Sequence, residues 1–411
     1  MPSPKRILLF IYNSYRDPIV QGSLFRYLIR YKEALGGSAT FELITYEQAD
    51  YPMTDAERAA THEELKSYNV CWNPIPYHTG GALILLKKVW DGLYGFRLAR
   101  RLHRVQPFDL IYSIGSIAGG YGLVLKRLLK TKLLIHTFEP HSTFMADFGY
   151  WSKQGMRYRV LHNFEQREGM RADYIMTGTD RMINQLAEMK SGAKVFKVPS
   201  CVDLQKFAPN EQARVRVRKE LGIEEKQVLL HLGKFGGIYM AEEAFDVFKA
   251  YLDLESDDFS PFLLILSPND PHWIQQQLDR IGARPEQYFV GKVGFEVVQD
   301  YINASEIGFC GIPSLPSQVY RSPIKNGEYW ACGKPVLLPS GISEDDQWAE
   351  NRNVGVVLKS LEKSELEVKM QHVKQLVEAV GDDLTRRCRE VAIEYRGIQQ
   401  TDPYYLEVFG K

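Results

Sequence analysis

One segment gives the clearest structural signal: residues 322–337 read SPIKNGEYWACGKPVL. Ser322 is a favourable N-cap, and Pro323 suits the first helical position, where its missing N–H is not needed. Gly333 can end the helix in the left-handed conformation. An apolar, strand-like run follows from residue 335. The segment therefore predicts a loop, a helix of about three turns that begins at Ser322, and a buried strand.

The same alternation of strand and helix extends over the whole chain. The strand-like runs are residues 6–12, 40–45, 69–72, 109–112, 132–136, 173–176, 194–198, 227–232, 262–266, 288–290, 307–310, 335–338 and 354–358. Helical patterns such as residues 24–35, 121–129 and 181–189 lie between them. This order is typical of βαβ units and a parallel sheet. We predict an α/β protein with two Rossmann-like, doubly wound domains facing a central cleft, where ligands bind beyond the carboxyl ends of the strands.

The length of 411 residues favours two domains, because single cores stop growing beyond about 250–300 residues. The strand-like run that ends at residue 198 is followed by an irregular segment up to Pro209. We expect an N-terminal domain over residues 1–205 and a C-terminal domain over residues 206–385. The aromatic end of the chain, residues 386–411, is expected to be helical and to pack back on the first domain.

Composition excludes several classes of protein. Charged residues make up 25% and apolar types 45%, which is usual for soluble globular proteins. The longest apolar runs are far shorter than the roughly 20 residues of a membrane-spanning helix, and we expect no signal peptide. The five cysteines form no CxxC pair, which favours a reducing cytosol over a disulfide framework. We expect a cytoplasmic protein that binds no nucleic acid, since no recognition motif is present.

The neutral total charge hides an asymmetry. Residues 1–205 hold 27 Lys+Arg and 19 Asp+Glu, whereas residues 206–411 hold 24 and 32. Within residues 80–106, six basic residues stand against only Asp91 and are interleaved with leucines, Trp and Tyr. That composition is typical of an interfacial helix, which would make an anionic membrane surface a partner of the first domain. The alternative is an ordinary helix with one apolar face in the core.

The helix predicted from Ser322 offers an anion site. Free N–H groups and the positive dipole end of a helix bind phosphates, and Lys325 adds a charge in the first turn. Glu328 shares the face of Lys325 and is able to accept hydrogen bonds from a vicinal diol such as a ribose. The alternative is a capped core helix with a solvated Lys–Glu pair. Acidic runs such as residues 344–346 are interpreted as solvated loops, and no metal site is expected.

A glycine-rich turn, residues 232–239 (LGKFGGIY), follows the strand-like run 227–232. Gly233 and Gly236 would let backbone amides approach a phosphate, and Lys234 would supply charge. The spacing is neither that of a Walker A loop nor GxGxxG. A turn without a ligand is the alternative.

Three loops at strand ends in the first half are further candidates. The run HTFEPHS at residues 136–142 places Glu139 and His141 where either would orient a hydroxyl or act as a base, and His136 is expected to point into the core. The alternative is a polar loop with no role. The loops 13–22 and 115–122 put Asn13, Gly22 and Tyr121 at strand ends as candidate substrate contacts. Tight packing of strand against helix is the favoured alternative for the second loop.

Taken together, the blocks at residues 198–209 (VPSCVDLQKFAP), 232–234 (LGK) and 322–336 resemble the retaining family 4 nucleotide-sugar glycosyltransferases (glycosyltransferase group 1 type) of the GT-B fold. The last block is the specific one. The first half resembles the family mainly in its order of strands and helices.

The resemblance implies transfer of a sugar from a UDP- or GDP-sugar to a hydroxyl acceptor, with retention of configuration and with no metal or other cofactor. It implies that Lys234 contacts the diphosphate and Glu328 the ribose, with help from Gly233, Gly236 and the residues Ser322, Pro323, Ile324 and Lys325. The family's catalytic position falls around Glu139–His141. The acceptor is expected to be a saccharide or lipid-linked saccharide of polysaccharide biosynthesis, at the inner face of the cell membrane.

The chain departs from the family pattern at two places. The family often has two glutamates separated by seven residues, and Tyr320 occupies the earlier position here. The usual Lys-Gly after the glycine-rich turn is replaced by residues 236–239 (GGIY). A nucleotide-sugar epimerase of the same fold and a non-catalytic nucleotide-sugar or glycan-binding protein are the alternative functions.

Overall fold

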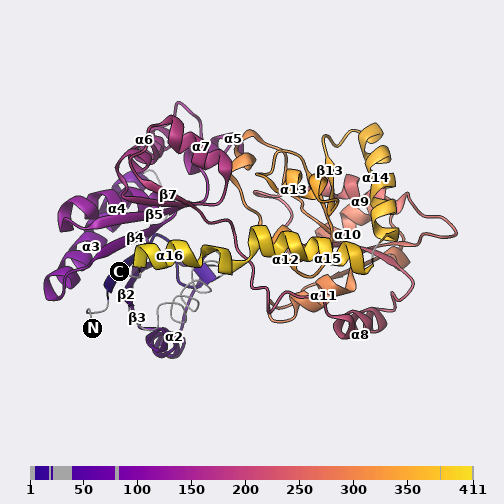
Figure 1. The fold of residues 1–411 in the computed structure, drawn as a ribbon, viewed down its shortest axis with the longest axis horizontal. Helices are drawn as coiled ribbons and strands as arrows, with labels where there is room; N and C mark the ends of the chain where they lie inside the picture. The colour runs from indigo at the N-terminus through magenta and orange to yellow at the C-terminus, as the bar shows by residue number, and fades with distance from the viewer. Residues whose placement is uncertain (1–4, 18–19, 22–38, 79–82, 380, 410–411) are drawn as a thin grey trace. The chain divides into compact units, whose positions relative to one another are not determined.

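The chain folds into two α/β units (Figure 1). A computed structural model describes residues 5–17, 20–21, 39–78, 83–379 and 381–409. The first unit comprises Met1–Val198 and Thr401–Lys411, and the second comprises Pro199–Gln400. Residues 386–400 thus belong to the second unit, and the end of the chain from Thr401 belongs to the first.

The first unit holds a seven-stranded parallel sheet in the order β3-β2-β1-β4-β5-β6-β7. Its strands are β1 (Lys5–Ile11), β2 (Ala39–Glu47), β3 (Val70–Pro76), β4 (Leu110–Ile114), β5 (Lys132–Thr137), β6 (Tyr174–Thr177) and β7 (Lys194–Lys197). Its connecting helices include α2 (Asp55–Ser67), α3 (Ile84–Val105), α4 (Ser116–Leu129), α5 (His141–Asp147), α6 (Met156–Arg171) and α7 (Asp180–Glu188). The helix predicted over residues 24–35 lies outside the described residues.

The second unit holds a six-stranded parallel sheet in the order β10-β9-β8-β11-β12-β13. Its strands are β8 (Gln227–Leu232), β9 (Pro261–Leu266), β10 (Tyr288–Gly291), β11 (Ile307–Phe309), β12 (Val336–Pro339) and β13 (Gly355–Leu358). Its helices include α8 (Glu211–Leu221), α9 (Glu242–Leu252), α10 (Pro271–Arg280), α11 (Val298–Ala304), α12 (Ile324–Ala331), α13 (Asp345–Asn351), α14 (Lys363–Glu378) and α15 (Asp382–Val391). Every predicted strand is present, so the prediction of two doubly wound parallel sheets is confirmed.

Continuous apolar strands are explained by helices on both faces of each sheet. All six residues of β9 are buried. Leu264 packs into one core of the second unit, whereas its neighbours Leu263 and Ile265 pack into the core on the other face. None of the described helices has the length and apolar character needed to cross a bilayer.

The last helix, α16 (Asp402–Phe409), belongs to the first unit. The Phe409 ring lies 6.2 Å from that of Phe41 and 5.8 Å from that of Tyr112, measured between ring centroids. The Lys5 ammonium donates to the carbonyl of Val408 at 3.2 Å. These contacts fasten the chain end to the strands of the first sheet.

The second unit contains a buried ion pair. Arg396 and Asp345 are both 0% exposed and form a salt bridge. The Asn326 amide donates to Asp345 Oδ2 at 2.7 Å, and Arg396 also donates to Ser322 Oγ. The interpretation of residues 344–346 as a solvated loop was therefore wrong at Asp345, because a cation far along the chain neutralises its charge in the interior.

Removing one partner of this pair should destabilise the protein strongly. We expect Arg396→Met or Asp345→Leu alone to lower the free energy of unfolding by about 3–5 kcal/mol, because each leaves a buried charge without its partner. The double variant should cost less than the sum of the two. Urea unfolding followed by tryptophan fluorescence measures these losses.

The matched control is Arg352→Met, which breaks the exposed ion pair with Glu394. It should cost less than about 1 kcal/mol. A single loss at Arg396 or Asp345 as small as that of the control would contradict the structural role of the buried pair.

Candidate functional site

The glycine-rich turn after β8 is fastened to the carboxyl edge of the second sheet. The Gly233 N–H donates to the carbonyl of Leu266 at 2.8 Å, and the Phe235 N–H donates to Asn269 Oδ1 at 3.0 Å. Further on, the Met240 N–H donates to the carbonyl of Gly311 at 2.9 Å. The turn therefore lies where ligands bind to a doubly wound sheet.

Lys325, from the first turn of α12, lies against this turn. A Cβ atom on Gly233 would collide with the Lys325 ammonium, and Gly233 has a φ of +107° that only glycine adopts easily. The ammonium is also 4.5 Å from the centroid of the Tyr239 ring. Two segments that were predicted separately as phosphate sites therefore meet at one place.

A buried histidine lies next to this cation. Burial, with a smaller contribution from the charge of Lys325, lowers the pKa of His231 to about 3. His231 is therefore neutral at physiological pH.

The two lysines of this region carry its positive charge, and Lys234, three residues after His231, is exposed. Neither Lys234 nor Lys325 has a carboxylate partner among the residues that the structure describes. The turn thus presents positive charge that no described side chain neutralises.

The start of α12 differs from the prediction. The helix begins at Ile324 with Pro323 as the N-cap, and it contains 8 residues instead of about three turns. Ser322 does not cap it, because its hydroxyl accepts from Arg396 and from the N–H of Ser200 at 3.0 Å. The side-chain hydrogen bond expected of an N-cap is absent from this end. The first amides of α12 have no intrahelical acceptor and are left for another acceptor.

The remaining predicted donor residues surround this point. Gly236 has a φ of +77°, and its N–H donates to the carbonyl of Met240 at 3.0 Å. Glu328 lies one turn beyond Lys325 and is 6% exposed. After burial, the charge of Glu328 contributes to raising the pKa of the Cys332 thiol. The structure therefore brings Gly233, Gly236, Lys325 and Tyr239 together, with Glu328 further along the helix.

Glu139 and His141 form a polar cluster beyond the end of β5 in the first unit. His141 Nδ1 is 3.3 Å from Glu139 Oε1. Nearby, the Ser142 N–H donates to Glu165 Oε1 at 3.1 Å, and the Ser142 hydroxyl is 3.4 Å from His162 Nδ1. This arrangement couples two carboxylates, two imidazoles and a hydroxyl.

Two groups of this cluster, His141 and Glu165, have raised pKa values. Burial disfavours the charged form of His141, but the hydrogen bond and charge of Glu139 and the charge of Glu165 outweigh it and raise the pKa of His141. Burial raises the pKa of Glu165. A histidine whose pKa is raised by a neighbouring carboxylate can donate or accept a proton near neutral pH.

The other predicted residues of the first unit have varied places. His136 is buried and its Nδ1 is 3.0 Å from the Tyr112 hydroxyl, which confirms the prediction of a core histidine. Asn13 donates to Asp17 Oδ2 at 2.8 Å. The Tyr121 hydroxyl donates to the carbonyl of Lys88 at 2.7 Å within an aromatic cluster. Gly22 lies outside the described residues.

Sequence reasoning missed several members of these sites. Tyr239 belongs to the glycine-rich run, but nothing in the local sequence indicates that its ring contacts the Lys325 ammonium. Glu165 and His162 come from α6 and join the His141 cluster only through the fold. Among the described residues, no group of three or more His, Cys, Asp or Glu is placed to hold a metal ion.

Comparison with known proteins gives structural relatives only. No family model and no curated protein sequence matches the chain. The sucrose-phosphate synthase of Thermosynechococcus elongatus matches with a TM-score of 0.70 and 16% identity, over 99% of this chain and 98% of that one. Anabaena Alr3699/HepE, solved in complex with UDP, matches with a TM-score of 0.68 and 13% identity, over 99% of each chain.

WaaG, a glycosyltransferase involved in lipopolysaccharide biosynthesis, matches with a TM-score of 0.66 and 12% identity, over 98% of this chain and 99% of that one. Similarity at these identities shows the fold. The chain therefore has the two-unit GT-B architecture that was predicted.

The coupling of His141 to Glu139 leads to a prediction about titration. In Glu139→Gln, the pKa of His141 should fall below its usual 6.5, because burial then acts with one fewer opposing charge. His136, whose pKa burial lowers to about 4, is an internal control that should not change. NMR titration of the histidine side chains measures both. An unchanged His141 pKa in the variant would contradict the pairing.

The raised pKa of His141 makes the stability of the folded state depend on pH. The folded state binds the His141 proton more tightly than the unfolded state does, so the contribution of the pair is fully present below about pH 6.5. It is lost as the pH rises through the folded-state pKa.

Proposed function

We propose that this chain is a glycosyltransferase that transfers a sugar from a nucleotide diphosphate sugar to a hydroxyl acceptor, with retention of configuration. The observation that carries the proposal is the meeting of Lys325 and Gly233 beside the first turn of α12. Cations that no described carboxylate neutralises, the first amides of a helix and a glycine turn at the carboxyl edge of a parallel sheet are suited to a diphosphate. The structures solved with UDP and UDP-glucose on the same fold support this ligand class.

The reaction gives a role to cations that have no carboxylate partner within the described part of the chain. The bond between the anomeric carbon and the diphosphate oxygen breaks, and the acceptor oxygen forms the new bond to that carbon. Negative charge builds on the departing diphosphate, which takes up the acceptor proton. Lys325, Lys234 and the α12 amides would stabilise this charge where it develops. A carboxylate beside the lysines would cancel that effect.

The roles proposed for Glu328, Glu139 and His141 follow from the chemistry of their side chains. Glu328, buried one turn along α12, would accept hydrogen bonds from the ribose of the donor. Glu139 and His141 are proposed as the catalytic residues of the first unit, because a histidine paired with a carboxylate suits contact with a reacting hydroxyl. No metal is assigned to the reaction, since lysines and helix amides would carry the charge of the diphosphate.

We further propose that the acceptor is a saccharide or lipid-linked saccharide precursor of a cell-surface polysaccharide. The protein would act in the cytoplasm at the inner face of the cell membrane. The basic first half of the chain supports an anionic partner on that side.

Substitution of the lysines tests the donor assignment. Lys325→Met and Lys234→Met should each lower kcat by about 10²–10³-fold, because each removes a charge that stabilises the leaving group. Glu328→Gln should mainly raise KM for the donor, by roughly 10–100-fold, since hydrogen bonds to the ribose are weakened. Release of nucleotide from UDP- and GDP-sugars, with and without saccharide acceptors, is the measurement.

Lys363→Met, on the exposed surface of α14, is the matched control and should behave as wild type. Rates near wild type in both Lys325→Met and Lys234→Met would remove the assignment. Conversion of the donor without any acceptor, seen by NMR, would instead favour an epimerase. Donor binding that depends on Lys325 without any turnover would favour a binding protein.

The close approach of Lys325 to Gly233 gives a second test. Gly233→Ala and Gly282→Ala both place a side chain at positive φ, which costs about 1–2 kcal/mol. Nothing lies within 4 Å of a Cβ at Gly282, whereas one at Gly233 would displace the Lys325 ammonium. We expect similar losses of thermal stability in the two variants, but loss of donor binding, measured by calorimetry, in Gly233→Ala alone. Equal donor affinities would contradict the proposed site.

A further inference from the structure

Helix α3 presents its large apolar side chains to solvent. Leu86 is 63% exposed and Trp90 57% exposed, and Leu83, Val89, Leu93 and Tyr94 are also exposed. The face that α3 buries consists of Asp91, Gly92, Gly95 and Ala99. The helix therefore packs a face of small residues on the core, and its large apolar side chains lie outside that face. Monomeric soluble proteins rarely expose a continuous apolar stripe of this kind without a partner.

The orientation of α3 is fixed by its buried face. The Asp91 carboxylate accepts from the Tyr12 hydroxyl and pairs with His78 Nδ1. The Tyr46 hydroxyl donates to the carbonyl of Asp91 at 2.9 Å, and a Cβ on Gly95 would collide with the same hydroxyl. The helix therefore cannot turn its leucines inward without breaking these bonds and clashing.

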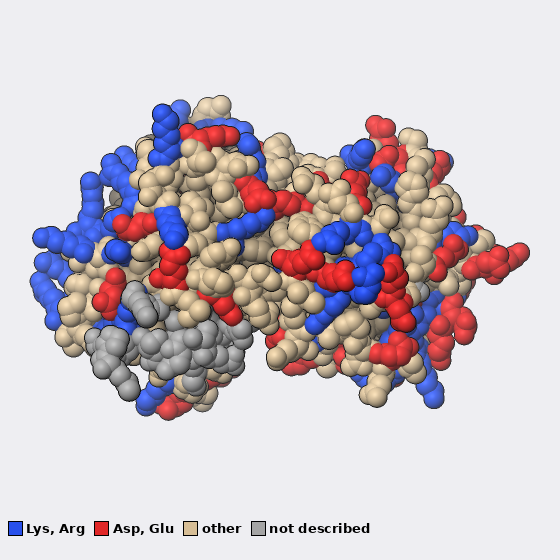
Figure 2. All heavy atoms as spheres, viewed as in Figure 1, with Lys and Arg blue, Asp and Glu red and all other residues tan. Residues whose placement is uncertain are grey.

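The same exposed face becomes basic towards the end of the helix. Arg97, Arg100, Arg101 and Arg104 continue the spacing of the apolar stripe, three or four residues apart. Among the described residues, none of these four arginines has a carboxylate partner. Figure 2 shows blue atoms gathered along the edge of the first unit where Figure 1 draws α3 and α4. The apolar stripe thus continues into unneutralised positive charge.

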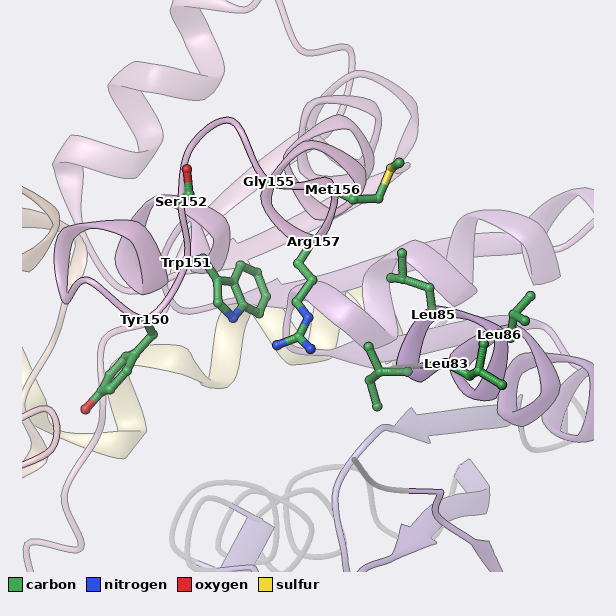
Figure 3. A pocket seen from close by; sticks show the side chains of 10 residues that line it. Leu83, Leu85, Leu86, Tyr150, Trp151, Ser152, Gly155, Met156 and Arg157 are labelled. Atoms are coloured by element: carbon green, nitrogen blue, oxygen red, sulfur yellow. The ribbon is translucent and has the colours of Figure 1, made fainter. Parts of the chain in front are cut away.

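A pocket of about 430 Å³ adjoins the apolar end of α3. It lies between Leu83–Leu86 at the start of the helix and the segment from Tyr150 to Arg157. Figure 3 shows the Arg157 side chain reaching down between Trp151 and these leucines. Met156, at the start of α6, is also exposed. The pocket combines apolar walls with one cation, which suits an apolar chain that carries an anionic group.

We propose that the exposed face of α3, together with this pocket, docks on the surface of an anionic lipid bilayer. Leu86, Val89 and Trp90 would enter the boundary between headgroups and acyl chains, and the four arginines would lie over the lipid phosphates. The pocket would receive the first part of a lipid chain beneath its phosphate. The inference rests on the proposed function only for the identity of that lipid as the acceptor, because docking itself requires no turnover.

Charge complementarity favours a bilayer over a second copy of the chain. In a two-fold interface the same face would meet itself, which supplies no negative charge for the four arginines. An anionic bilayer has an apolar interior next to its layer of phosphates. The interior matches the apolar stripe of α3, and the phosphates match the four arginines. Trp90 and Tyr94 are also residue types enriched at the interface between membrane and water.

Vesicle flotation of the full chain tests the proposal. We expect binding to vesicles of phosphatidylcholine with phosphatidylglycerol at low salt, much less binding at high salt, and little to phosphatidylcholine alone. Arg100→Gln/Arg101→Gln should lower the partition coefficient by roughly 30-fold, because each cation near an anionic surface contributes about fivefold. Leu86→Glu/Trp90→Glu should abolish binding.

The matched controls are Val368→Glu and Lys363→Gln, exposed positions on α14 of the second unit, which should bind as wild type. Circular dichroism and donor binding by calorimetry should be unchanged in all these variants, so a failure of docking is separable from a failure of the proposed function. No binding at low salt, or binding indifferent to the α3 substitutions, would overturn the proposal. Self-association that Leu86→Glu/Trp90→Glu abolishes, without lipid binding, would identify a second copy as the occupant instead.

Discussion

The buried ion pair of Arg396 and Asp345 fixes the position of α12 in the second unit. Arg396 reaches Ser322 on one side of the pair, and Asn326 reaches Asp345 on the other, so the residues before and within the first turn of the helix are tied to the same charges. Lys325 lies between these two anchors in the sequence. A buried charge is costly unless an opposite charge and hydrogen bonds compensate it. The network therefore favours the one position of α12 in which Ser322 and Asn326 reach the ion pair. The approach of Lys325 to Gly233 depends on it.

The two units use charge in different ways. In the second unit, Lys234 and Lys325 have no carboxylate partner among the residues with described positions. Gly233 leaves space for the Lys325 ammonium, because a Cβ atom there would collide with it. In the first unit, carboxylates surround His141, and the hydrogen bond and charge of Glu139 raise the pKa of this histidine against the effect of burial. Fixed positive charge suits a departing diphosphate, and a histidine that can gain or lose a proton suits a reacting hydroxyl. The proposed division of roles between the units follows from this difference.

Much of the architecture was predictable because strands buried on both faces leave continuous apolar runs, as in β8 and β9. The glycines and lysines of the donor loops were predictable because a positive φ and a helix start have local signatures. Three features were not. The sequence around Ser322 predicts a helix cap, and that around Asp345 predicts a solvated loop, because Arg396, which contacts both residues, is remote in the sequence. The orientation of α3 was open because composition does not reveal that Asp91 and Gly95 are held by Tyr12 and Tyr46. Long-range pairing decided each case.

A crystal structure of the chain with a bound nucleotide diphosphate sugar is the decisive measurement for the proposed donor site. We expect the diphosphate within hydrogen-bonding distance of the Lys325 ammonium and the first amides of α12, with the ribose hydroxyls at Glu328. The Gly233 turn should keep its backbone conformation. A donor bound elsewhere, with this turn and Lys325 free of phosphate, would show that α12 and the Gly233 turn do not form the donor site.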